Sequence, residues 1–116
     1  MERFIVVAWF GGIPYMLQYR GVVEWFFYNN HIKMFKTKKT AIKAAYKVSA
    51  RYKYDTIKVY SMTEGEMVST DHIRRWEREE AERVVFELEK VCAKNNKREH
   101  LSVRYFSSRV KVAANK

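Results

Sequence analysis

The fold is decided by an apolar stretch near the start of the chain, Phe4-Ile5-Val6-Val7-Ala8-Trp9-Phe10. Its residues are β-branched or aromatic and lack helical spacing, so we expect the central first strand of a sheet. The stretch ends at Gly11-Gly12-Ile13-Pro14, where a hairpin turn is favoured over a phosphate-binding loop. It is also far shorter than the roughly 20 residues of a membrane span, so the chain is predicted to be soluble.

Two further strands are predicted directly after this turn. Tyr15–Arg20 and Val22–Tyr28 are rich in strand-forming residues and are separated by Gly21. We therefore expect the domain to open with three antiparallel strands.

A helix is predicted from Lys38 to about Tyr52. Thr37 precedes it as an N-cap, because its hydroxyl accepts a hydrogen bond from a free first-turn amide, and no Gly or Pro interrupts the segment. One side of this helix is apolar and should pack on the sheet. That side comprises Ala41, Ala45, Val48 and Tyr52.

A second helix is predicted from Asp71 or His72 to about Asn95. Trp76 falls at the edge of its apolar side, and Phe86 falls on the opposite side, where we expect it to be exposed. Both are therefore candidate protein-interface residues. The apolar side comprises Ile73, Ala81, Val84, Leu88, Val91 and Cys92.

Alternating segments complete the predicted fold. Thr56–Met62 alternates as a half-buried strand does, and the chain alternates again from Leu101 to Tyr105, where one or two final strands are expected. The prediction is a single α+β domain spanning residues 1–116. It has an antiparallel sheet of about five strands packed with two helices, in the order βββαβαβ, and a ferredoxin-like variant is one form of it.

Positive charge is concentrated in one segment. Nine of the 23 Lys and Arg residues fall within residues 33–58, where Asp55 is the one acid. The predicted helix in this segment carries a cationic stripe without the acids that would form ion pairs four residues away, which indicates an anionic partner. A solubilising outer face is the alternative. The stripe comprises Lys39, Lys43, Lys47 and Arg51, which recur every fourth residue.

We predict that the chain binds nucleic acid through its phosphates. A net charge of +10 attracts polyanions of any kind. Tyr46, Tyr52 or Tyr54 would stack on bases. The predicted contacts lie on the stripe, around it and in a second basic region near the end of the chain: Lys36, Lys38, Lys39, Lys43, Tyr46, Lys47, Arg51, Lys53, Arg104, Arg109 and Lys111.

The sequence carries no recognisable catalytic or metal-binding signature. His31, His72 and His100 are scattered, without the partners that a metal site needs. The single cysteine, Cys92, cannot form an internal disulfide, which fits a reducing cytoplasm. We therefore expect a cytoplasmic protein that is not an enzyme and uses no cofactor or metal.

Phe35-Lys36-Thr37, followed by Ala41 and Ala45, forms an F-x-T-x-x-x-A-x-x-x-A arrangement between aromatic strands and an alternating strand. In this, the chain resembles small bacteriophage accessory proteins as far as about residue 60. The resemblance implies a host-modulating protein, a class that includes inhibitors of host defence such as anti-CRISPR proteins. The alternative function is thus inhibition of a host protein or nucleoprotein by direct binding, and a homodimer is left open. The resemblance transfers no functional residue.

Overall fold

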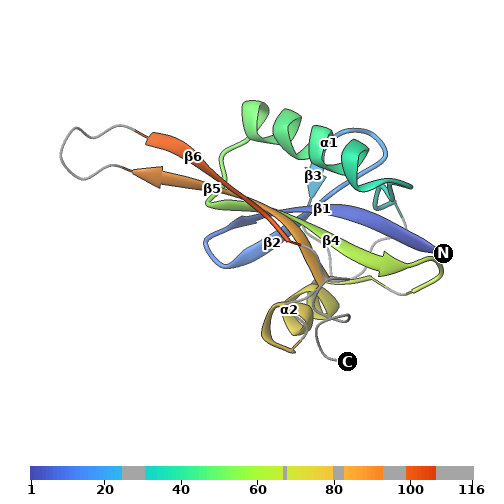
Figure 1. Ribbon diagram of the computed structural model, residues 1–116. Coiled ribbons are helices and arrows are strands. Elements are labelled where there is room, and N and C mark those ends of the chain that lie inside the picture. Colours follow the sequence, from blue (N-terminus) through green and yellow to red (C-terminus); the bar gives the residue numbers. More distant parts are fainter. Residues whose placement is uncertain (25–30, 67, 80–82, 93–98, 107–116) are drawn as a thin grey trace, which may run out of the picture.

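The computed structural model describes residues 1–24, 31–66, 68–79, 83–92 and 99–106 of the 116-residue chain. These residues form an α+β fold, as predicted, with a fully antiparallel sheet in the strand order β3-β2-β1-β4-β5-β6 and two helices (Figure 1). The element order within the described residues is βββαβαββ, which adds one strand to the predicted order.

Strand β1 (Glu2–Phe10) lies in the middle of the sheet, as its apolar sequence predicts. It pairs with β2 (Ile13–Leu17) through a turn in which Gly11 and Gly12 both have positive φ, and on its other side it pairs with β4 (Thr56–Thr63). Residues 4–8 are all buried, because a helix covers each face of the sheet. A strand buried on both faces has no polar alternation, which explains its sequence.

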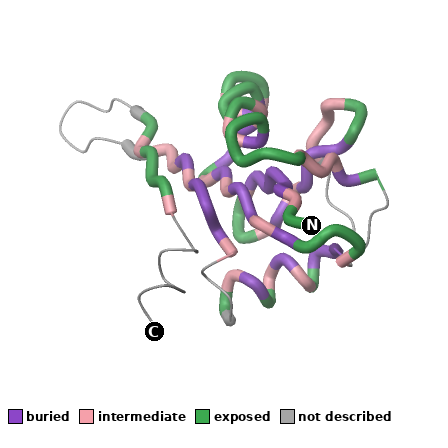
Figure 2. The backbone as a smooth tube through the Cα atoms, turned by 45° about the vertical axis from the view of Figure 1, so that its right-hand side comes forward, coloured by how far each residue is buried: buried purple, intermediate pink, exposed green. Residues whose placement is uncertain are grey.

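The two helices lie on opposite faces of the sheet (Figure 1). Helix α1 (Lys38–Arg51) packs Ala41, Ala45 and Val48 into one core, whereas α2 (Thr70–Glu79) packs Ile73 and Trp76 into a second core. Figure 2 shows the buried residues concentrated in the sheet between the helices and the exposed residues on their outer sides.

Helix α1 begins and ends close to the predicted residues. Thr37 is its N-cap, and the Thr37 hydroxyl accepts a hydrogen bond from the Thr40 amide at 3.2 Å. At the other end, the Tyr52 amide donates to the Val48 carbonyl at 3.0 Å. The local signals of the sequence are therefore enough to define this helix.

The prediction of a long second helix is wrong. Helix α2 ends at Glu79, and Val84–Cys92 forms strand β5, which pairs with β4 so that Leu88 lies opposite Ile57. The spacing of the apolar residues at positions 84, 88 and 91 resembles that of a helix. The same segment also alternates between apolar residues and Glu87 and Glu89, and pairing with β4 selects this two-residue period.

The remaining strands lie at the two ends of the sheet. Strand β3 (Val23–Glu24) follows a turn at Gly21, and the rest of its predicted range lies outside the described residues. Strand β2 begins two residues before and ends three residues before the predicted strand. Strand β6 (Glu99–Tyr105) pairs with β5, as expected for a final strand. Within the described residues, no helix is both long and apolar enough to cross a membrane.

Candidate functional site

The predicted cationic stripe lies on the solvent side of α1. Lys39, Lys43, Lys47 and Arg51 are all exposed, whereas the opposite side of the helix is buried against the sheet. Because the stripe advances 40° around the helix with each four-residue step, it turns from the outer face at Lys39 toward β2 at Arg51. The second half of the stripe therefore faces a neighbouring part of the fold.

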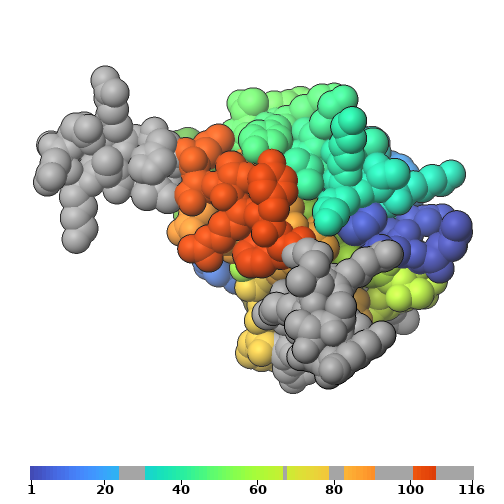
Figure 3. All heavy atoms as spheres, viewed as in Figure 1, coloured from blue at the N-terminus to red at the C-terminus, as the bar shows by residue number. Residues whose placement is uncertain are grey.

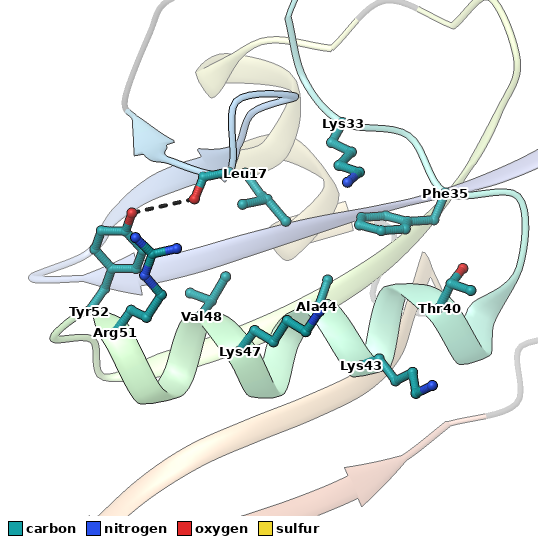
Figure 4. Close-up of a pocket in the computed structure, with 11 residues that line it drawn as sticks. Leu17, Lys33, Phe35, Thr40, Lys43, Ala44, Lys47, Val48, Arg51 and Tyr52 are labelled. Atoms are coloured by element: carbon teal, nitrogen blue, oxygen red, sulfur yellow. Dashed lines mark hydrogen bonds between the residues drawn. The ribbon is translucent and has the colours of Figure 1, made fainter.

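A groove of about 300 Å³ lies where the stripe meets that neighbouring part (Figure 4). One wall is α1, and the other is formed by the end of β2, the turn at Gly21 and the segment that leads into the helix. The groove is lined by Leu17, Gly21, Lys33, Phe35, Thr40, Lys43, Ala44, Lys47, Val48, Arg51 and Tyr52.

Four cations line this groove, and no Asp or Glu does. Lys43, Lys47 and Arg51 come from α1, and Lys33 comes from the opposite wall. Within the described residues, none of the four forms an ion pair. Positive charge thus converges from two segments on a concave surface, which a merely solubilising helix face does not require.

The wall opposite α1 is held by backbone hydrogen bonds to the sheet. Phe35 exchanges two with Phe4 in β1, at 2.9 and 2.7 Å, and the Lys33 amide donates to the Leu17 carbonyl at 2.9 Å. At one end of the groove, the Tyr52 hydroxyl donates to the Gly21 carbonyl at 3.4 Å (Figure 4). The groove is therefore present before any ligand binds.

The groove also offers apolar and aromatic surface beneath its charges. The Lys33 ammonium lies 5.3 Å from the centroid of the Phe35 ring, and the Arg51 guanidinium lies 5.8 Å from that of Tyr52. Leu17 and Val48 line the apolar part of the surface. A ligand with both an anionic group and a flat apolar group matches this lining.

The other predicted nucleic-acid contacts surround the groove or lie away from it. Lys36 and Lys38 are exposed at the start of α1, and Lys53 is exposed just after its end. Arg104 is exposed on β6, near the Glu87 carboxylate at 3.7 Å, and three strands separate β6 from β2. Arg104 therefore does not line the groove. The predicted contacts Arg109 and Lys111 lie outside the described residues.

Of the tyrosines predicted to stack on bases, Tyr52 alone lines the groove. Tyr54 is buried, and the Lys90 ammonium lies 5.2 Å from its ring centroid, so Tyr54 is not available for stacking. Tyr46 is partly exposed on the other flank of α1, toward β6. Its pKa is raised by burial and, to a smaller extent, by the hydroxyl of Tyr105.

The expectation that Phe86 is an exposed anchor is wrong, and Trp76 is also buried. Phe86 lies in β5, and its ring centroid is 5.8 Å from that of Tyr46 and 5.2 Å from that of Tyr105. Trp76 belongs to the core under α2, with the Arg83 guanidinium 4.4 Å from its ring centroid. Neither side chain has the exposed area that an interface anchor needs.

Lys33 and Phe35, which form the wall opposite α1, were not among the site residues predicted from the sequence. Lys33 opens the basic segment, which is the one signal that could have drawn attention to it. Its place opposite α1 depends on long-range bonds to β1 and β2, and no local pattern encodes these.

Two acids, Glu77 and Glu87, form a separate polar network with Lys58 and Tyr60 on the α2 side of the sheet. The Lys58 ammonium lies 2.5 Å from Glu77 and 3.6 Å from Glu87. The Tyr60 hydroxyl donates to Glu77 at 2.5 Å, and burial, followed by this carboxylate, raises the Tyr60 pKa. The described residues contain no group of His, Cys, Asp and Glu side chains arranged to hold a metal. Glu77 and Glu87 thus both lie within ion-pair distance of Lys58.

No protein-family model matches the chain, and neither a curated protein nor a solved structure matches it. Its function therefore has to be inferred from the chemistry of the groove and of α1.

Proposed function

We propose that this chain is a cytoplasmic, non-catalytic protein that binds nucleic acid through the phosphate backbone, using the exposed face of α1 and the groove beside it. The observation that carries the proposal is the convergence of Lys33, Lys43, Lys47 and Arg51 on one concave surface without an acid among its lining residues. Four cations that form no ion pair with any described residue repel one another, and an anionic ligand relieves this repulsion.

The cations that line the groove are suited to binding phosphate groups. Lysine ammonium groups on flexible stems follow a phosphate chain without a fixed geometry, and an arginine guanidinium binds phosphate oxygens in pairs. Phe35 and Tyr52 add aromatic surface where a base could stack. Nothing in the lining resembles a donor and acceptor pattern that reads base edges, so binding should depend weakly on sequence.

The test compares two double variants with equal loss of charge. Lys43→Gln with Lys47→Gln removes cations from the groove, and Arg75→Gln with Arg78→Gln removes exposed cations from α2 on the other face of the sheet. Fluorescence anisotropy with a labelled oligonucleotide should show a large loss of affinity for the first variant and a small loss for the second. Equal losses would mean that total charge matters and this surface does not.

A second candidate function is the inhibition of a host protein or nucleoprotein, for example by a phage-encoded anti-defence protein. The apolar lining of the groove favours it, because Leu17, Phe35 and Val48 could bury an apolar side chain of an acidic protein segment. A pulldown from host lysate, with and without nuclease, separates the two functions. Specific capture of one protein that survives nuclease and is lost in Lys43→Gln with Lys47→Gln supports the inhibitor; capture lost with nuclease supports nucleic acid.

A further inference from the structure

Strand β6 forms a long edge of the sheet. It has seven residues, and no described segment pairs with its outer side. A long edge strand offers a row of free amides and carbonyls to any other strand, and proteins usually protect such edges with charge, proline or a short length. Between Leu101 and Tyr105 the outer side of β6 has no proline, and its one charged residue, Arg104, lies 3.7 Å from the Glu87 carboxylate of β5.

The backbone groups that face outward can be identified. The Phe106 amide donates to the Val85 carbonyl at 2.9 Å, so the backbone of Phe106 faces β5. In an antiparallel ladder, alternate residues face opposite sides, and the β5–β6 register is continuous from Tyr105 back to Glu99. The amides and carbonyls of Leu101, Val103 and Tyr105 therefore point away from β5, toward the open edge.

The side chains of these three residues are also unusually exposed for their type. Leu101, Val103 and Tyr105 are 43%, 38% and 67% exposed. They lie on the α1 side of the sheet, because they pair with Lys90, Leu88 and Phe86, and Leu88 and Phe86 belong to the core under α1. Figure 3 shows β6, in orange-red, at the molecular surface beside α1. An apolar sheet face thus borders an open edge.

We infer that the outer edge of β6 pairs with β6 of a second copy of this chain, forming a symmetric dimer with a continuous sheet. The sequence of β6 is self-complementary about Val103. A two-fold axis at this residue places Val103 opposite itself, Leu101 opposite Tyr105 and Ser102 opposite Arg104. Every apolar side chain then meets an apolar one, and no pair of like charges is opposed across residues 101–105.

The two-fold symmetry of the dimer determines on which face the cationic stripes lie. The two-fold axis of an antiparallel strand pair is perpendicular to the sheet, so both copies present the same face on the same side. The two α1 helices, with their cationic stripes, would therefore lie on one face of the dimer. The dimer does not depend on the proposed nucleic-acid binding, and either can hold without the other.

Sedimentation velocity over a dilution series tests the dimer in the absence of nucleic acid. The wild-type chain should sediment as a dimer, and Val103→Lys, which opposes two ammonium groups at the axis, should sediment as a monomer. Tyr19→Lys makes the same charge change at an exposed residue outside β6 and should remain a dimer. A monomeric wild type, or a Val103→Lys variant that stays dimeric, would overturn the inference.

Disulfide crosslinking tests the register. In a Cys92→Ser background, Val103→Cys places two thiols on residues whose Cα atoms are about 5.5 Å apart in a hydrogen-bonded antiparallel pair, which is within the disulfide range. Ser102→Cys is the control, because Ser102 faces Arg104 of the other copy. Mild oxidation should link the Val103→Cys chains and leave the Ser102→Cys chains unlinked. Equal linkage at both positions, or none at either, contradicts this register.

Discussion

At the scale of single residues, the burial of Phe86 is incompatible with the interface role that the sequence suggests for it. Phe86 has no accessible surface, and the rings of Tyr46 and Tyr105 pack against it on the α1 side of the sheet. A residue in this position contributes to stability through packed area, and a partner cannot reach it.

Phe86→Ala should therefore destabilise the fold by about 3–5 kcal/mol, the usual cost of truncating a buried aromatic side chain. Urea denaturation measures this loss. Tyr19→Ala is the control, because Tyr19 is 61% exposed and exposed substitutions usually change stability by less than about 0.5 kcal/mol. A Phe86→Ala variant as stable as Tyr19→Ala would contradict the burial of Phe86 in the core.

The negative charge of the Glu66 carboxylate stabilises the folded state. Both of its carboxylate oxygens accept hydrogen bonds from Arg83, at 2.9 and 2.8 Å, and this guanidinium lowers the Glu66 pKa below its ordinary value of 4.5. A pKa that is lower in the folded state stabilises the fold above the unfolded-state pKa, and this stabilisation is lost as the pH falls through the folded-state value.

Glu66→Gln should therefore be less stable than the wild type at pH 7, and the difference should shrink in acid, below pH 4.5. Chemical denaturation of both proteins at several pH values measures it. A difference that is constant with pH would mean that the carboxylate's charge does not contribute.

At the scale of elements, local signals in the sequence predicted some parts of the fold and not others. β1 and α1 could be predicted, because an uninterrupted apolar run and a Thr N-cap act over a few residues. β5 could not, because its segment fits two periods, and the pairing with β4 that selects one of them is a long-range contact. The groove was not predicted, for the same reason: the stripe on its α1 wall follows from helical spacing, whereas Lys33 and Phe35 are placed by bonds to distant strands.

Thr37→Ala should destabilise the protein by about 1 kcal/mol, because the Thr40 amide loses the oxygen that caps it. Thr37→Ser keeps that oxygen and should stay close to the wild type. Thermal unfolding of the three proteins measures the difference. If Ala and Ser behave alike, the hydroxyl does not stabilise the helix.

At the scale of the whole molecule, charge is divided between the two faces of the sheet. On the α2 side, Glu66 and Glu77 pair with Arg83 and Lys58, so the charges there are largely balanced. On the α1 side, the cations of the stripe and the groove have no acid among the groove's lining residues. The unpaired cations of the described fold are therefore concentrated on the α1 side, which is the arrangement that attracts a polyanion to a defined surface.

The measurement that tests the central claim most directly is the salt dependence of oligonucleotide binding by the wild type and by Lys43→Gln with Lys47→Gln. If the groove neutralises phosphates, log affinity should fall linearly with log salt, by about 0.9 per duplex phosphate or 0.7 per single-strand phosphate contacted, because bound counterions are released. The variant should give a shallower line. A wild-type affinity that does not change with salt, or an equal slope in the variant, would contradict phosphate binding by this surface.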